Sequence, residues 1–156
     1  SLENFFNIDF IKNIYPNAKF IHTFRNPLDS AISIYQSMLP DLSWTHNFED
    51  ILLYMDHYRK VLKYFKSKYP DLILDINLEE FTKKSEELSK KMFKFCGLTW
   101  NENIHNFYKR RDLYSKTLSF NQIRSKVLKY NDKKYQSYFN ILSDYKDKYQ
   151  WLNLRK

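Results

Sequence analysis

The sequence predicts an α/β fold that is rich in helices and built around a small parallel sheet. Short apolar runs with β-branched residues occur at residues 19–24 and 72–76, and segments with helical periodicity lie on either side of each run. Such alternation of helix and strand is typical of a parallel sheet covered by helices. The 156 residues are 43% hydrophobic and 19% aromatic, which suffices for a buried core and is too apolar for a disordered chain.

The first predicted elements are a helix and a strand. Phe5, Phe6, Phe10 and Ile14 recur at helical spacing, which predicts a helix over residues 3–15 that ends before Pro16. The run at 19–24 then has the length and composition of a buried strand.

A second helix is expected to begin directly after this strand. Asn26 suits the N-cap, Pro27 suits the first helical position, and Asp29 complements the positive end of the helix dipole. A loop at 40–45 separates it from a long helix that ends before Pro70. That helix is indicated by an apolar stripe of Phe48, Ile51, Leu52, Met55, Tyr58, Leu62 and Phe65.

The remaining chain contains a second strand and further helices. Strand 72–76 precedes a helix that ends at Gly97, a typical C-cap residue. Beyond Asn101 we expect short helices and loops, with residues 123–129 helical. Two strands are few for a free-standing sheet, so we expect further strands upstream. We therefore interpret residues 1–156 as a single, partial domain.

The charge, glycine and histidine content of the sequence limit the ligands that this chain is expected to bind. The 26 Lys and Arg residues exceed the 18 Asp and Glu residues, and the net charge of +8 favours an anionic partner. The sequence has one glycine, which excludes a glycine-rich phosphate loop of the P-loop or dinucleotide-binding type within this chain. The four histidines show no metal-ligand spacing, so we expect no metal.

The number of cysteines and the length of the apolar runs indicate in which cellular compartment the chain is expected. Cys96 is the only cysteine, so no intrachain disulfide can form, which fits a reducing compartment. No apolar run approaches the roughly 18 residues of a transmembrane helix. We expect a cytoplasmic location and no membrane segment in this chain.

The candidate site is the junction between the first strand and the second helix. Ligands of open α/β sheets bind at the carboxyl ends of strands, and a helix N-terminus offers N–H groups to an anion. Arg25 adds a fork of donors suited to phosphate. Ser33, one turn beyond Asp29, can add a hydroxyl from the same helix face. Taken alone, Arg25 could instead pair with Asp29 as an ordinary ion pair.

This segment resembles the 3′-phosphate-binding motif of the sulfotransferases that use 3′-phosphoadenosine 5′-phosphosulfate (PAPS). The family motif is Arg-Asp/Asn-Pro-x-Asp, with a Ser eight residues after the Arg. It is matched by Arg25-Asn26-Pro27-Leu28-Asp29 and by Ser33. The resemblance implies that Arg25 and Ser33 bind the nucleotide 3′-phosphate, on the P-loop-NTPase-like fold of that family.

The likeness continues along nearly the whole chain. Residues 78–81, 92–100 and 117–124 are similar, in order, to further segments of the family, the last one to bacterial and tyrosylprotein-type members. Carried over residue by residue, the resemblance adds to the nucleotide-binding set Ser119, Gln122, Arg124 and Lys134. Leu78 departs from the pattern because the family has a Tyr beside the adenine there, and Tyr135 stands in place of a Trp.

The resemblance implies transfer of a sulfuryl group from PAPS, as co-substrate, to a hydroxyl or amine acceptor without a metal. In the family the 5′-phosphosulfate loop and the usual catalytic base precede the Arg25 motif. Neither is recognisable in this chain, so its catalytic residues are unknown. We therefore interpret the chain as a C-terminal portion, of bacterial type, that is inactive by itself and whose acceptor is unknown.

Two other classes of function remain open at this stage. A basic chain rich in aromatic residues could be a nucleic-acid-binding module, but such a module should gather its basic residues on one face. Here they are scattered along several predicted helices, so we expect no nucleic-acid partner. A purely structural helical module is also possible, but it leaves the spacing of Arg25 and Ser33 as a coincidence.

Overall fold

A computed structural model describes residues 3–110, 112, 124–131 and 133–153. The chain divides into two compact units. The terminal unit comprises residues 1–75 and 131–156, and the middle unit comprises residues 76–130. The prediction of a single partial domain stays a prediction, and each unit is described separately below.

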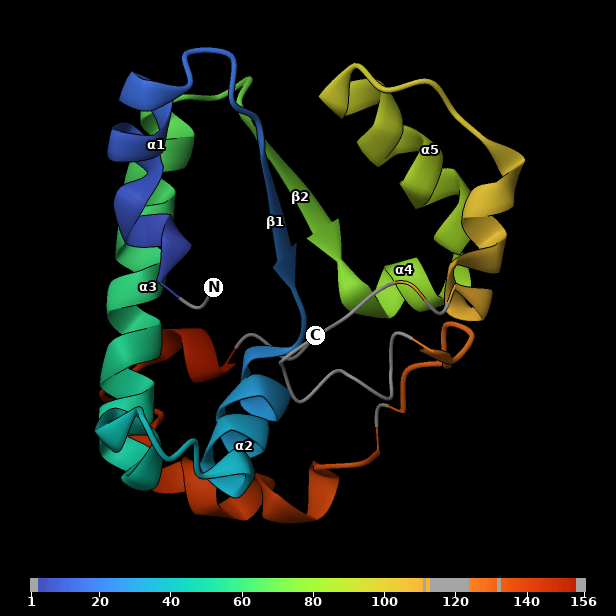
Figure 1. The fold of residues 1–156 in the computed structure, drawn as a ribbon. Coiled ribbons are helices and arrows are strands. Elements are labelled where there is room, and N and C mark those ends of the chain that lie inside the picture. Colours follow the sequence, from blue (N-terminus) through green and yellow to red (C-terminus); the bar gives the residue numbers. More distant parts are fainter. Residues whose placement is uncertain (1–2, 111, 113–123, 132, 154–156) are drawn as a thin grey trace. The chain divides into compact units, whose positions relative to one another are not determined.

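The described residues contain one two-stranded sheet. Its strands are β1 (Phe20–Phe24) and β2 (Ile73–Asn77), which lie side by side and point the same way in Figure 1. The Phe20 N–H donates to the Leu72 carbonyl oxygen at 2.8 Å where the pairing starts. Both strands lie within one residue of the predicted ranges. This helix-rich arrangement with a small parallel sheet is compatible with the predicted α/β class.

The helices of the terminal unit largely follow the predicted pattern. The first one is divided into a 3₁₀ turn, η1 (Asn4–Asn7), and α1 (Ile8–Ile14), where one continuous helix was expected. Phe5 in η1 packs edge-on against Tyr58 of the long helix, with ring centroids 4.9 Å apart. The remaining helices are α2 (Pro27–Ser37), η2 (Ser43–His46), α3 (Phe48–Lys68), η5 (Gln136–Tyr145) and η6 (Gln150–Asn153).

The core of the terminal unit joins its two chain segments. The C-terminal residues Leu142, Trp151 and Leu152 are buried in the same cluster as apolar residues of α2 and α3. Burial of this apolar area is the main force that holds η5 and η6 against those helices. The residues of α2 and α3 in the cluster are Leu28, Ala31, Ile32, Ile51, Leu52 and Met55.

The middle unit is helical. Asn77 caps α4 (Leu78–Lys83) by accepting hydrogen bonds from the N–H groups of Glu79 and Glu80, at 2.7 and 3.1 Å. The next helix, α5 (Ser85–Cys96), ends at Gly97 as predicted. Gly97 has φ of +70°, a left-handed conformation that glycine adopts without strain. The 3₁₀ helix η3 (Glu102–Lys109) follows.

The predicted helix at residues 123–129 is wrong from Ser125 onward, whereas Arg124 is in 3₁₀ conformation. Residues 126–130 have no regular secondary structure. Val127 and Leu128 are 40% and 74% exposed, so the apolar residues of this segment are not covered by packing. A short helix without tertiary packing is marginal in water. The backbone is held in another way at Tyr130, whose N–H donates to the Thr82 hydroxyl at 3.2 Å.

No helix within the described ranges combines the length and the apolar character needed to cross a membrane.

Truncation of Leu142 should separate the contribution of the C-terminal segment from that of the remaining core. Leu142 is 1% exposed, so we expect Leu142→Ala to lower the free energy of unfolding by about 2–5 kcal/mol. The neighbouring Ile141 is 58% exposed and serves as the control, with an expected change within about 0.5 kcal/mol. Urea unfolding followed by circular dichroism measures both. Equal effects of the two substitutions would contradict the packing of η5 described above.

Candidate functional site

The site is built where β1 ends and α2 begins. Arg25 follows the last residue of β1, and Asn26 caps the helix by accepting a hydrogen bond from the Leu28 N–H at 2.9 Å. Pro27 occupies the first helical position, where a missing N–H costs nothing. These local preferences fix the direction in which the chain leaves the strand, and they place Arg25 beside the positive end of the helix dipole.

Arg25 lies along the first turn of α2. Its Nε donates to the Ser30 hydroxyl at 3.3 Å, and its Nη2 reaches the Asp29 carbonyl oxygen at 3.5 Å. The Ser30 hydroxyl in turn donates to the Asn26 carbonyl oxygen at 3.1 Å. Arg25 is half-buried, so the guanidinium is oriented by the helix and still accessible to a solute.

The C-terminal segment brings a second set of polar groups to this corner. The Lys134 ammonium lies 4.8 Å from the centroid of the Tyr135 ring, in a cation–π contact. Lys134, Ser33 and the charge of Arg25 all act to lower the pKa of Tyr135, so these three residues lie in its neighbourhood.

The electrostatics around Tyr135 favour negative charge. Burial raises the pKa of Tyr135, because a buried phenolate loses its hydration. The hydrogen bonds with Lys134 and Ser33 and the charges of Lys134 and Arg25 act in the opposite direction. They outweigh burial, and the pKa of Tyr135 lies below its ordinary value of 10.0. The hydroxyl of Tyr135 is thus more easily ionised than in water.

Three of the residues predicted from the sequence, Arg25, Ser33 and Lys134, lie near enough to Tyr135 to act on its pKa. Arg124 lies in the middle unit and is half-buried there, and Ser119 and Gln122 lie outside the described residues. Leu78, which stands where the family has a Tyr beside the adenine, is the first residue of α4 and 37% exposed. The roles of all these residues in binding stay predictions.

Sequence reasoning did not select Tyr135 as a site residue. It was noted only as a replacement for Trp after two lysines. Its signal in the sequence was a hydroxyl-bearing aromatic residue directly after Lys133 and Lys134, in a segment otherwise interpreted through its charges. Nothing local indicated that this segment would pack beside Ser33, about a hundred residues earlier.

A second polar cluster joins the two strands to α3. The His22 Nδ1 lies 2.6 Å from the Asp75 Oδ1, and its Nε2 is hydrogen-bonded to the Tyr58 hydroxyl. Lys66 donates to the other Asp75 oxygen at 2.6 Å. Both partners of His22 are distant from it in the chain, so local sequence does not reveal them. The neutral imidazole fits this arrangement, with Nδ1–H donating to Asp75 and Nε2 accepting from Tyr58.

The ionisation of this cluster follows from burial and pairing. Burial lowers the pKa of His22, and the hydrogen bond to Asp75 only partly offsets it. Burial likewise raises the pKa of Tyr58 to about 12. For Asp75, burial is outweighed by hydrogen bonds from Lys66 and His22, which hold its pKa below 3.8. The cluster therefore ties the sheet to α3 with neutral His22 and Tyr58 and an ionised Asp75.

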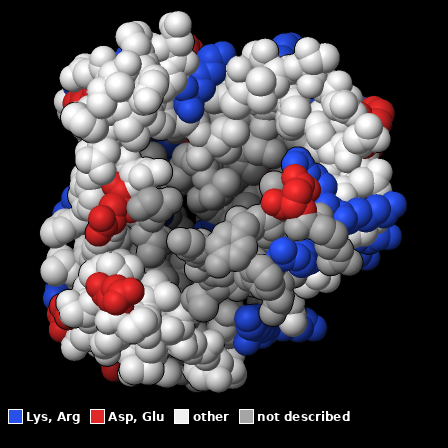
Figure 2. Space-filling view, in the orientation of Figure 1, with Lys and Arg blue, Asp and Glu red and all other residues white. Residues whose placement is uncertain are grey.

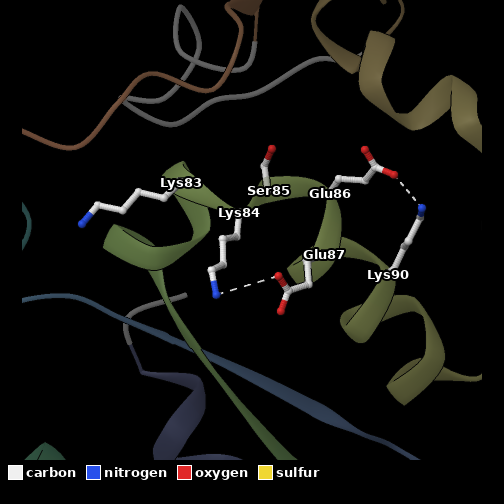
Figure 3. Close-up of a pocket in the computed structure, with 6 residues that line it drawn as sticks. All are labelled: Lys83, Lys84, Ser85, Glu86, Glu87 and Lys90. Atoms are coloured by element: carbon white, nitrogen blue, oxygen red, sulfur yellow. Dashed lines mark hydrogen bonds and ion pairs between the residues drawn. The ribbon is translucent and has the colours of Figure 1, made fainter.

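A shallow hollow in the middle unit is the third candidate. Figure 3 shows its lining residues on α4, α5 and the link between them. Lys90 pairs with Glu86 at 2.5 Å, and Lys84 lies 3.9 Å from Glu87, so opposite charges are matched along the hollow. Such matching leaves little net field for a charged ligand.

One group near this hollow has atoms spaced for a metal ion. Ligand atoms of Glu86, Glu102 and His105 lie within 4.8 Å of one another, and all three residues are exposed. The Lys90 ammonium already occupies a carboxylate oxygen of Glu86 and would compete with a cation there. Because exposed acidic groups often lie this close without a metal, we assign no site to them.

Charge on the described residues of the face in Figure 2 is dispersed. On the face shown in Figure 2, Lys and Arg side chains occur in several small groups, and acidic side chains lie beside some of them. A nucleic-acid-binding face would instead present a continuous basic stripe. The corner at Arg25 is thus the candidate in which two described positive groups, Arg25 and Lys134, act on the same residue.

Comparison with known proteins gives two matches. Residues 1–102 match the model of a family described as the sulfotransferase family. A protein of Aquifex aeolicus (strain VF5), named only as an uncharacterized protein, is 28% identical over 144 residues. That alignment covers 90% of this chain and 19% of the Aquifex protein, so the chain spans about a fifth of the length of this relative.

Acidification should weaken the fold through His22. Its pKa is lower in the folded chain than the ordinary 6.5, so the unfolded chain binds the proton more readily. The contribution of neutral His22 to the free energy of unfolding is fully present above pH 6.5. It is lost as the pH falls through the pKa that His22 has in the folded chain. The lowered pKa of Asp75 changes the pH dependence of stability only below the ordinary pKa of 3.8, outside this interval. We therefore expect the urea midpoint to fall between about pH 7.5 and about pH 5.5.

His22→Gln isolates this effect. The variant should show a smaller fall in the urea midpoint over the same pH interval, because the titrating imidazole is gone. His57→Gln is the matched control, since His57 is exposed on α3 beside Tyr58, and it should keep the full fall. An unchanged pH dependence in His22→Gln would show that other groups are responsible.

Proposed function

This chain belongs to the sulfotransferase family, and we propose that its Arg25 corner binds the 3′-phosphate of PAPS in a sulfuryl-transfer enzyme. Arg25 and Ser33 are the ligands that the sequence motif assigns to this phosphate. Lys134 is a third residue near them, and it supplies a further positive charge. The acceptor is a hydroxyl or amine compound, and the donor leaves as adenosine 3′,5′-bisphosphate.

The observation that carries this proposal is the position of Arg25 at the capped N-terminus of α2, the helix that also bears Ser33. Lys134, far from both in the sequence, lies over the ring of Tyr135, and Arg25 and Ser33 also act on the pKa of that residue. Charge-assisted hydrogen bonds from Arg and Lys are the strongest that a phosphate receives in proteins. The N-terminus of α2 adds its dipole. These groups support an anion of phosphate size at the end of β1.

The chemistry defines what else the enzyme needs. The acceptor oxygen or nitrogen forms a bond to sulfur while the bond from sulfur to the 5′-phosphate oxygen breaks, and the acceptor proton passes to a base. Preorganised donors must stabilise the charge that develops on the transferred group and on the leaving phosphate. The 3′-phosphate is remote from these bonds, so the Arg25 corner positions the donor and does not itself react.

The remaining predicted residues complete the proposed nucleotide site. Ser119 and Gln122 would close over the nucleotide with Arg124, and Leu78 would lie near the adenine. The P-loop-like architecture of the family is part of the same proposal. A cytoplasmic, bacterial location follows from the resemblance and from the single cysteine.

Loss of Arg25 should abolish the preference for a 3′-phosphate. We expect adenosine 3′,5′-bisphosphate to bind the chain more tightly than adenosine 5′-phosphate in calorimetric titrations at fixed salt. Arg25→Ala should weaken the bisphosphate by about 10- to 100-fold, the value of a hydrogen bond to a charged group, and leave adenosine 5′-phosphate little changed. Lys60→Ala is the control, because Lys60 is an exposed, positive residue paired within α3.

Two results would contradict the proposed site. Equal affinities of the wild-type chain for the two nucleotides would show that no 3′-phosphate site exists. Equal losses in Arg25→Ala and Lys60→Ala would show that only the net charge of the protein attracts the nucleotide. Ionic strength offers a further check, since screening should weaken the bisphosphate more than the monophosphate.

We also predict that the 156 residues bind nucleotide without transferring the sulfuryl group. Their single glycine, Gly97, ends α5, so no glycine-rich loop within them can surround the 5′-phosphosulfate. Loss of even one preorganised donor commonly costs about 10²–10³ in rate. Incubation with PAPS and a panel of phenols, tyrosyl peptides, sugars and amines should release no bisphosphate above the blank. Acceptor-dependent release that disappears in Arg25→Ala would show that these residues suffice for catalysis.

A further inference from the structure

Ser30 lies in the candidate site although the sequence motif gives it no part there. It is a half-buried residue near the start of α2, between Asp29 and Ser33. Its hydroxyl accepts a hydrogen bond from the Arg25 Nε at 3.3 Å and donates one to the Asn26 carbonyl oxygen at 3.1 Å. These two bonds form a chain that runs from the guanidinium, through the hydroxyl, to the N-cap residue of the helix.

We propose that Ser30 is a positioning residue of the anion site. It holds one edge of the Arg25 guanidinium against α2 and thereby turns the other edge toward the 3′-phosphate, which Ser30 itself does not touch. This inference rests on the proposed function, because it names a residue that acts on the nucleotide through Arg25.

The number of protons determines the direction of the bond between Ser30 and Arg25. A serine hydroxyl has one proton to donate and two lone pairs, whereas a guanidinium has donors only. The Ser30 proton goes to the Asn26 carbonyl oxygen, which also accepts from the Ser30 N–H at 3.0 Å. The hydroxyl therefore presents a lone pair to the Arg25 Nε. Because linked hydrogen bonds polarise one another, the bond to Asn26 strengthens the bond from Arg25.

The planar guanidinium converts this contact into a defined orientation. Nε and Nη2 of Arg25 share one edge of the plane, and both are directed at the first turn of α2. Nε donates to Ser30, and Nη2 reaches the Asp29 carbonyl oxygen at the longer distance of 3.5 Å. The other edge, formed by Nη1 and the second N–H of Nη2, points away from these two oxygens. Two parallel N–H groups of this kind bind two oxygens of one phosphate.

The energetic consequence is a smaller loss of entropy on binding. An arginine side chain has several rotatable bonds, and a ligand that it grips must otherwise immobilise them. The contact with Ser30 restrains the guanidinium before the nucleotide arrives. A loss of this contact should therefore weaken the grip on the 3′-phosphate and leave the helix intact.

The same helix contains a serine in the ordinary structural role. Helical serines often donate to the carbonyl oxygen four residues earlier, without any function. The Ser37 hydroxyl does so in the last turn of α2, where it donates to the Ser33 carbonyl oxygen at 2.7 Å. Among the described hydrogen bonds, Ser30 differs from Ser37 by the bond that it accepts from Arg25. Ser37 is therefore the matched control.

Ser30→Ala tests the hydroxyl without disfavouring the helix, because alanine is the best helix former. We expect the affinity for adenosine 3′,5′-bisphosphate to fall about two- to tenfold, the value of one hydrogen bond. The affinity for adenosine 5′-phosphate should stay unchanged. Ser37→Ala should leave both affinities unchanged. Ser30→Thr, whose hydroxyl can make the same bond to the carbonyl oxygen four residues earlier, should retain the wild-type affinities.

A double-mutant cycle shows whether Ser30 acts through Arg25. In the Arg25→Ala background the guanidinium is gone, so Ser30→Ala should cause no further loss of affinity for the bisphosphate. An equal loss in both backgrounds would show that Ser30 acts independently of Arg25 and would overturn the inference.

Proton exchange of the guanidinium gives a readout that needs no ligand. The Nε–H signal of Arg25 in nitrogen-15 NMR spectra is identified by its loss in Arg25→Ala. A hydrogen-bonded proton exchanges with water more slowly, so this signal should exchange faster in Ser30→Ala than in the wild-type chain and in Ser37→Ala. Equal exchange rates in all three would show that Ser30 does not hold the guanidinium, and the inference would fail.

The outcomes separate this inference from the proposed function. If the wild-type chain prefers the bisphosphate and Ser30→Ala keeps that preference in full, the inference fails alone. If Ser30→Ala and Ser37→Ala weaken binding equally, the effect belongs to the helix and the inference also fails. If the wild-type chain shows no preference, the proposed function fails, and this inference fails with it.

Discussion

The candidate site depends on the packing of the C-terminal segment against α2 and α3. Leu142, Trp151 and Leu152 are buried with apolar residues of those helices, and the same burial holds Tyr135 beside Ser33. Hydrophobic burial has no direction of its own, but dense packing makes the position of each buried ring specific. The position of Tyr135 near Arg25 and Ser33 is therefore a consequence of the core. Without it, Lys134 would be one more exposed lysine on a basic chain.

The beginning of α2 supplies the other half of the site, and it does so locally. The Asn26 cap and Pro27 start the helix at a defined residue, and Arg25 is then held along its first turn through Ser30 and the Asp29 carbonyl oxygen. This half of the site resembles other helix N-termini that bind anions. Such sites attract negative charge but discriminate little between one anion and another. Selectivity for a phosphate monoester would come from the distant half, because only there do further donors approach from another direction.

Two kinds of sequence pattern differed in how well they predicted structure. Patterns that rest on backbone chemistry were accurate: the cap at Asn26 and the C-cap at Gly97 were found as expected. The apolar runs that predicted both strands were also correct. The helix expected at residues 123–129 is absent from residues 126–129, where Leu128 is 74% exposed. Spacing indicates a helix only when something covers its apolar face. His22 shows the same limit, since its partners Asp75 and Tyr58 come from other elements.

The sequence by itself determined the strand that ends at Arg25, the helix that begins at Pro27 and the spacing of Arg25 and Ser33, and this spacing indicated the family. These features involve residues within one or two helical turns, where capping, dipole and side-chain periodicity act. Only the tertiary structure decided that Tyr135, about a hundred residues further along the chain, is buried in the same core cluster as the apolar residues of α2 and α3. The physical reason is that their encounter depends on which apolar faces pack together, and many residues far apart in the chain contribute to that free energy at once.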